Sequence, residues 1–224
     1  MGFSSCSNPP QTEEKVEPSP FAVVSQKLTF QVDTLTTTLI SPWGMTWLPD
    51  GRLLVTERKG EILVFKDDKS TGEKLTGVPA VSEVNQAGLL DIAVHPKYEE
   101  NGWIYMSYAK KQGKGEVLVI ARAKLNGNAL EGLEEVFVCG PEWEGGRHFG
   151  SRIVFDNDGY LYFSNGDKGS RPVNAQELDN DHGKIHRIYD DGRIPEDNPF
   201  VNTPGASPSI WTYGNRNPQG MVYD

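Results

Sequence analysis

The sequence contains no run of about 18 apolar residues, so no segment of it is suited to cross a membrane as a helix. An excess of positive charge is also absent, because 22 Lys and Arg stand against 31 Asp and Glu, giving a net charge of −9. Phosphate binding needs a basic surface, which argues against nucleic acid as a partner. Helical periodicity is weak throughout, and this disfavours an α/β fold.

Cysteine is scarce as well, with two residues, Cys6 and Cys139. Cys139 follows an apolar run and is predicted to be a small buried side chain. Small residues directly before Cys6 are typical of the end of a bacterial lipoprotein signal. We therefore predict that Cys6 is lipidated in an extracytoplasmic protein, either periplasmic or anchored to a membrane. The charged and apolar parts of such a signal are missing before Cys6, and an unmodified tail cysteine is the alternative.

Residues 1–27 are predicted to form a disordered tether, because the stretch 7–20 is polar and rich in proline and cannot bury enough apolar surface to order itself. From residue 28 the pattern changes, and residues 28–224 are assigned to one β domain. Its first predicted strand leads into residues 41–44. The residues that suggest this strand are Phe30, Val32, Thr34 and Leu35.

A short apolar run, a turn and a second apolar run recur along the chain. The copies begin at Gly44, Gly88, Gly150 and Gly220, with spacings of 44, 62 and 70 residues, and the last is cut off. Two copies have Asp-Gly at the turn, the strongest short-range signal of a hairpin. Repeats of this size predict an all-β protein, a β-propeller. Three copies and a start do not close a ring, so we expect about three blades with aggregation-prone open edges.

Two polar residues flank the hairpin of the third copy. His148 precedes its first strand and Asp167 follows its second, 19 positions later, so the two side chains can meet. A carboxylate there orients an imidazole and raises its basicity, and an imidazole takes up a proton near neutral pH. The alternatives are a structural loop histidine and an ordinary turn aspartate. The other histidines, His95, His182 and His186, show no metal-ligand spacing, and no carboxylate cluster predicts a calcium loop.

The densest polar segment is residues 213–220, in which Pro218 gives rigidity to Arg216, Asn217 and Gln219. Such side chains can present a fixed set of hydrogen-bond donors to a planar polyanion. A surface turn is the alternative. Gln86 occupies the equivalent place in the second copy. We therefore expect both this segment and Gln86 to face the central channel of the propeller.

Five motifs, in order, resemble those of the soluble PQQ-dependent glucose and aldose sugar dehydrogenases. They are residues 43–58, 148–152, 183–187, 197–200 and 213–220. The resemblance runs from about Phe30 to Asp224 and implies a six-bladed propeller, of which about half is absent here. It also implies an oxidoreductase that converts aldose sugars to lactones at the anomeric carbon. PQQ is then the hydride acceptor, Ca²⁺ a second cofactor, and an external electron acceptor a partner.

The resemblance also implies a role for each candidate residue. His148 is the general base, Asp167 supports it, and Arg216 stabilises charge on the reduced quinone. The remaining assignments concern contacts with ligands. Asn217 and Gln219 contact the cofactor, and Gln86 lies near the substrate.

The sequence departs from the glucose enzymes directly before the base, where Arg147 replaces an aspartate. This favours the broader aldose type and leaves the sugar open. The calcium ligands and several cofactor and sugar contacts lie beyond Asp224 in the family, so we expect the chain alone to be inactive. Two other functions remain open. One is a calcium-dependent propeller lactonase, which Arg216 beside the metal would oppose, and the other is a propeller that binds sugar or protein without turnover.

Overall fold

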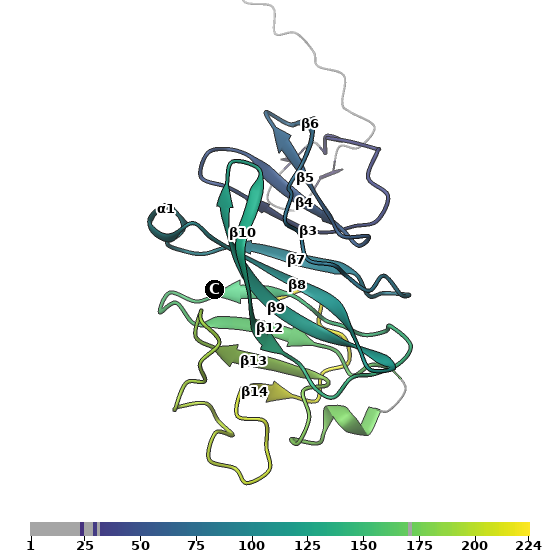
Figure 1. Ribbon diagram of the computed structural model, residues 1–224, viewed down its shortest axis with the longest axis vertical. Helices are drawn as coiled ribbons and strands as arrows, with labels where there is room; N and C mark the ends of the chain where they lie inside the picture. Colours follow the sequence, from purple (N-terminus) through teal and green to yellow (C-terminus); the bar gives the residue numbers. More distant parts are fainter. Residues whose placement is uncertain (1–22, 25–28, 31, 170–171) are drawn as a thin grey trace, which may run out of the picture. The chain divides into compact units, whose positions relative to one another are not determined.

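The computed structural model describes residues 23–24, 29–30, 32–169 and 172–224 (Figure 1). The chain divides into two compact units, residues 1–37 and 38–224. In the first unit, β1 (Val23–Val24) pairs antiparallel with β2 (Thr29–Phe30). Cys6 and most of residues 1–27 lie outside the described residues, so the lipidated tether stays a prediction.

The second unit consists of three four-stranded antiparallel sheets whose strands follow one another in chain order. The first sheet contains β3 (Pro42–Trp47), β4 (Leu53–Glu57), β5 (Glu61–Lys66) and β6 (Lys69–Lys74). The second contains β7 (Leu89–Val94), β8 (Trp103–Gln112), β9 (Gly115–Asn126) and β10 (Ala129–Val138). The third contains β11 (Ile153–Phe155), β12 (Leu161–Asn165), β13 (Lys184–Ile188) and β14 (Ile210–Tyr213).

Helical structure is limited, in the described chain, to α1 (Tyr98–Asn101) and the 3₁₀ turn η1 (Pro172–Ala175). Neither of these two helical segments of the described chain is long and apolar enough to span a membrane.

The hairpins form where Asp-Gly turns predict them. Between β3 and β4, Gly51 has a φ of 85°, a left-handed conformation that glycine adopts without strain, and its N–H donates to the carbonyl of Leu48. Between β11 and β12, Gly159 has a φ of 87°. There the Asp156 carboxylate accepts hydrogen bonds from the N–H groups of Asp158 and Tyr160.

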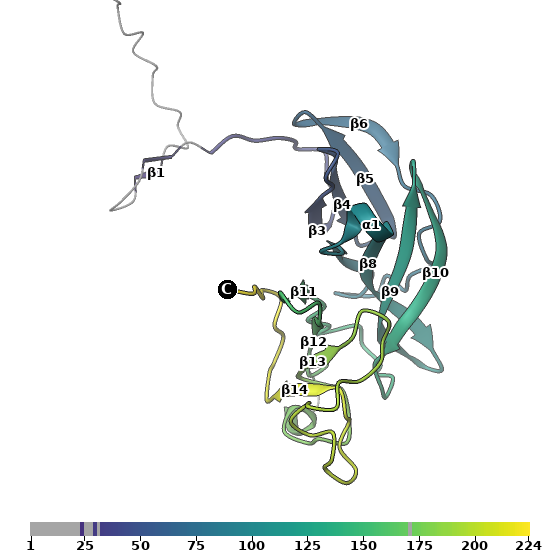
Figure 2. The same ribbon diagram turned by 90° about the vertical axis from the view of Figure 1, so that its left-hand side faces the viewer.

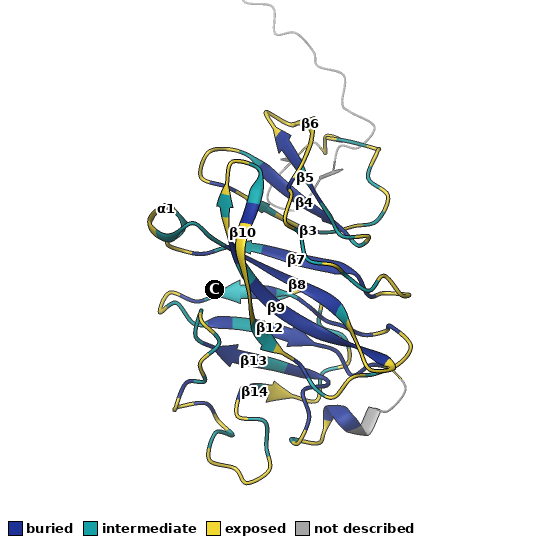
Figure 3. Cartoon of the chain, in the orientation of Figure 1, coloured by how far each residue is buried: buried dark blue, intermediate teal, exposed yellow. Residues whose placement is uncertain are grey.

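The three sheets pack against one another through their first strands, because β7 contacts both β3 and β11. Figure 2 shows β3 and β11 on the inner side of the sheets, with β6 and β10 on the outer side. Successive side chains of β7 point to opposite faces of its sheet, so the strand contributes to both interfaces. Leu89 lies in the core shared by the first two sheets, and Leu90 lies in the core shared by the second and third. Buried residues are concentrated in strands such as β8 and β9 (Figure 3). The prediction of an all-β propeller with about three blades is confirmed.

The strand predicted over Phe30 to Leu35 is wrong beyond Phe30. Residues 32–36 carry no strand, and Val32 and Leu35 are 46% and 47% exposed. The packing of side chains that normally selects a strand is therefore missing at these positions. Residues 220–224, where the fourth copy of the repeat begins, also carry no strand.

Asp91 on β7 joins the second blade to the third through hydrogen bonds. Its side chain is buried and accepts hydrogen bonds from Arg152 Nη1 at 2.7 Å and from the N–H of Ile153 at 2.8 Å. Burial raises the pKa of Asp91 to about 6, although the charge of Arg152 opposes this shift. Because the carboxylate has partners on a neighbouring blade, it fixes where β11 starts.

Gly44 on β3 lies directly against Asp91, and we expect Gly44→Ala to lower the free energy of unfolding by about 2 kcal/mol. A Cβ at Gly44 would lie 2.7 Å from Asp91 Oδ1 and 2.9 Å from Asp91 Cα, and the latter atom cannot move aside cheaply. Denaturant unfolding measures the effect. Gly140→Ala is the control, because a Cβ there meets no atom within 4 Å. Equal losses in the two variants would contradict this account of the interface.

Candidate active site

His148 lies in the loop between β10 and β11, where the backbone turns sharply. His148, Gly150 and Ser151 have φ values of 55°, 63° and 82°, all in the left-handed region. Such conformations in residues other than glycine are maintained only by the surrounding structure. Gly166 makes the turn possible, since a Cβ there would lie 2.1 Å from the carbonyl oxygen of His148.

The His148 and Asp167 side chains meet, as their positions in the sequence predict. Nδ1 of His148 lies 2.6 Å from Oδ1 of Asp167, and both residues are buried. The same oxygen accepts a hydrogen bond from the N–H of Gly169 at 2.8 Å. An ionised carboxylate only accepts, so Nδ1 carries the proton and Nε2 is left as the acceptor. The contact is confirmed, whereas the catalytic role of the pair stays a prediction.

Gln86 and Asn217 hold the histidine loop from two sides. Gln86 Oε1 accepts a hydrogen bond from the N–H of His148 at 3.0 Å, and Asn217 Oδ1 accepts one from the N–H of Gly150 at 3.0 Å. The family resemblance predicts contacts with substrate for Gln86 and with cofactor for Asn217, and these roles stay predictions. The structure shows a further task for both side chains, because their oxygen atoms fix the backbone on either side of the imidazole.

The segment from Arg216 to Gln219 is attached to the same region through its backbone. The carbonyl of Arg216 accepts a hydrogen bond from the N–H of Asp167 at 2.8 Å, and that of Gln219 accepts one from Arg152 Nε at 2.9 Å. The Arg216 and Gln219 residues are themselves exposed. The structure thus brings this segment, here called the arginine turn, beside the loops that carry His148 and Asp167.

Two buried lysines near this site are absent from the candidates found in the sequence. Lys168 Nζ donates to Asn165 Oδ1 at 2.7 Å and lies 3.9 Å from the centre of the Phe149 ring. Burial lowers the pKa of Lys168 to about 8, while the negative charge of Asp167 acts to raise it. Lysine is rarely buried, so its place in a glycine-flanked turn gives no sequence signal of this environment. Lys184, the second, is also fully buried.

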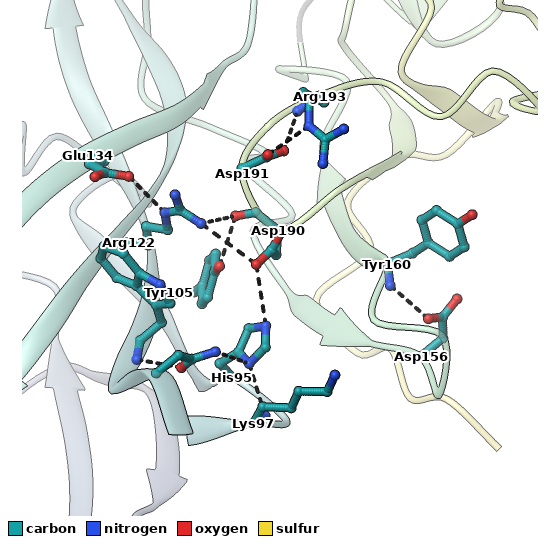
Figure 4. A network of polar contacts seen from close by, with 12 residues as sticks. His95, Lys97, Tyr105, Arg122, Glu134, Asp156, Tyr160, Asp190, Asp191 and Arg193 are labelled. Carbon is teal, nitrogen blue, oxygen red and sulfur yellow. Dashed lines mark hydrogen bonds and ion pairs between the residues drawn. The ribbon is translucent and has the colours of Figure 1, made fainter. Parts of the chain in front are cut away.

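His95 has a structural partner away from the candidate site. His95 Nε2 lies 3.5 Å from Asp190 Oδ2 (Figure 4). The carbonyl of Asp190 also accepts hydrogen bonds from Tyr105 and Arg122 at 2.8 and 3.1 Å. This network joins the second blade to the segment after β13. Burial lowers the pKa of His95 against the opposing effect of the Asp190 charge.

Metal ligands of the usual kinds are not gathered in this part of the chain. In the described ranges, no group of three or more His, Cys, Asp or Glu side chains is arranged to hold a metal ion. Cys139 is a buried free thiol, as predicted from its apolar neighbours, and burial raises its pKa.

Three consecutive four-stranded antiparallel sheets define the class of the fold, an incomplete β-propeller, and a histidine–carboxylate contact lies between two loops of its third blade. The chain belongs to the glucose/sorbosone dehydrogenase family, whose sequence profile matches residues 39–224. The resemblance seen in the sequence is confirmed.

Relatives with assigned activities show the same family. Aldose sugar dehydrogenase YliI of Escherichia coli is 39% identical over 198 residues, covering 87% of this chain and 53% of the relative. Quinoprotein glucose dehydrogenase B of Acinetobacter calcoaceticus is 29% identical over 237 residues, covering 92% of this chain and 48% of the relative. The PQQ-bound aldose sugar dehydrogenase of Streptomyces coelicolor superposes with a TM-score of 0.68 at 33% identity, covering 83% of this chain and 54% of that one. The chain therefore spans about half the length of these relatives.

Proposed function

We propose that the full-length gene product is a PQQ-dependent aldose sugar dehydrogenase, and that this chain supplies the acid–base part of its active site. The observation that carries the proposal is the 2.6 Å contact between His148 and Asp167. It lies beside the turn of Arg216, whose carbonyl binds the N–H of Asp167. Membership of the glucose/sorbosone dehydrogenase family supports the choice of reaction.

The residues present fit PQQ by their chemistry. The cofactor is a planar quinone that carries several carboxylates, so its site needs a cation and hydrogen-bond donors. Arg216 is exposed on a turn that also carries the carboxamides of Asn217 and Gln219. The Asn217 oxygen is occupied by Gly150, which leaves the amide N–H₂ end as the donor for a ligand. We propose that these three residues hold PQQ, and that Ca²⁺ is held by ligands outside the described residues.

The proton chemistry follows from the tautomer of His148. Because Nδ1 donates to Asp167, Nε2 accepts the proton of the anomeric hydroxyl group, and Asp167 stabilises the imidazolium that results. When bound, PQQ supplies the acceptor for the hydride that leaves the anomeric carbon. Gln86 keeps the imidazole in place through its bond to the N–H of His148. The proton then passes from the imidazolium to solvent.

The test is dye-linked oxidation of aldoses by the full-length gene product without additions, with PQQ, and with PQQ and Ca²⁺. We expect activity only when PQQ is present, and none from residues 1–224 alone. The lactonase alternative is tested in parallel by lactone hydrolysis with Ca²⁺ and no PQQ. Sugar binding without PQQ-dependent oxidation would overturn the proposal in favour of a binding propeller.

A further inference from the structure

Lys184, the first residue of β13, has its ammonium group buried among backbone carbonyls. The residue is completely buried. Its Nζ donates to the carbonyls of Asn174 at 2.9 Å, Ala175 at 3.3 Å and His182 at 2.6 Å. An ammonium group has three donors, so all of them are used. Burial lowers the pKa of Lys184 to about 8, and the group is therefore still charged at pH 7.

The register of the third blade places Lys184 between the two strands that lead to the candidate site. Lys184 pairs with Asn165, the last residue of β12, and with Tyr213, the last residue of β14. Asp167 follows two residues after Asn165, and Arg216 follows three after Tyr213. Both functional segments thus leave the sheet at the level of this lysine.

One of the carbonyls that Lys184 binds, together with the carbonyl directly before it in the chain, also holds the turn that carries Arg216. The oxygen of Ala175 accepts a second hydrogen bond from the N–H of Gly214 at 2.7 Å. The oxygen of Gly183, adjacent to the lysine, accepts one from the N–H of Asn215 at 3.0 Å. The next residue, Arg216, receives the N–H of Asp167 on its carbonyl at 2.8 Å. The ammonium group is therefore linked to the backbone of Asp167 by the shared Ala175 carbonyl, the covalent backbone from Gly214 to Arg216, and the hydrogen bond between Arg216 and Asp167.

We propose that Lys184 is a positioning residue, which sets the turn of Arg216 relative to the His148–Asp167 pair; its functional part rests on the proposed function. The ammonium group acts through the shared oxygen of Ala175, because a bound positive charge fixes the carbonyls that the turn needs as acceptors. Without the charge these carbonyls lie buried with fewer donors, and the loop over residues 174–183 must rearrange to satisfy them.

Hydrogen exchange without cofactor tests the structural part in the full-length gene product. We expect Lys184→Met to accelerate exchange about tenfold or more in peptides that contain Gly214, Asn215 and Asp167. Ile188→Ala is the matched control, since Ile188 is a buried residue on the same strand that packs in the apolar core. At temperatures equally far below each variant's midpoint, the control should leave these peptides unchanged. Equal acceleration throughout the third blade would overturn the proposal and leave Lys184 as a merely stabilising residue.

Cofactor binding tests the functional part. Titration of PQQ against the apo full-length gene product should give a Kd about tenfold higher for Lys184→Met, with the aldose KM unchanged. Lys184→Gln retains donors on a shorter side chain and should lie between wild type and Lys184→Met, which keeps the test decisive if the methionine variant does not fold. An unchanged Kd with accelerated exchange would overturn the functional part. A wild type that does not bind PQQ refutes the proposed function, while the exchange data still decide on Lys184.

Discussion

His148→Ala should lower kcat for PQQ-dependent aldose oxidation by about 10³-fold in the full-length gene product, which lies within the range of a lost general base. The expectation rests on the tautomer, because the 2.6 Å contact of Nδ1 with Asp167 leaves Nε2 as the acceptor. Loss of the imidazole does not remove the hydrogen bonds made by the backbone of this residue. The loop should keep its bond from the N–H of residue 148 to Gln86. Steady-state kinetics with saturating PQQ measures the effect.

His95→Ala is the control for the loss of a buried histidine. His95 is as buried as His148 and also has a carboxylate partner, Asp190, but it belongs to the network between the second blade and the segment after β13. We expect a lower melting temperature for His95→Ala and a kcat close to that of the wild type. Retention of activity in His148→Ala, or an equal loss in the two variants, would refute the assignment of the base.

Much of the fold can be predicted from the sequence because its signals are local. An Asp-Gly turn between two apolar runs specifies a hairpin through a few neighbouring residues, and repetition of the unit specifies blades. The strand predicted through Val32 and Leu35 rests on its residue types alone. Both residues remain about half exposed, so the burial and packing that select a strand are missing there.

The residues of the candidate site can be predicted from the sequence, but the hydrogen bonds that their side chains form cannot. The spacing of His148 and Asp167 around one hairpin predicts their contact. The bonds from Gln86 and Asn217 to the histidine loop, in contrast, join residues 62 and 67 positions apart. Only the tertiary fold brings them together. The environment of Lys184 is hidden for a different reason, because its acceptors are backbone carbonyls, and carbonyls are the same in every sequence.

The loops of this site support one another through backbone groups. The N–H of Asp167 binds the carbonyl of Arg216, and the hydroxyl of Ser164 binds the carbonyl of Pro218. Arg147, directly before His148, is exposed and makes neither of these bonds. A different residue at that position would therefore leave this support of the loops in place.

Asp167→Asn should lower kcat by about 10²-fold or more while leaving the fold and the PQQ affinity nearly unchanged. The carboxylate oxygen that contacts His148 also accepts the N–H of Gly169 at 2.8 Å. In the variant, the carboxamide oxygen can take the place of this atom and keep both contacts. It carries no negative charge, so the imidazolium that forms when Nε2 takes the substrate's proton is no longer stabilised.

Asp156→Asn is the matched control for this exchange, because Asp156 is also a buried turn aspartate that accepts backbone N–H groups, at the other end of the same blade. We expect it to leave kcat within about twofold of the wild type, since surface turns away from the site carry no part of the chemistry. Kinetics of both variants at equal PQQ saturation, together with their melting temperatures, separates the loss of the negative charge from a folding effect. If Asp167→Asn were as active as Asp156→Asn, the carboxylate would serve only to hold its own turn, and its charge would have no part in the chemistry of His148.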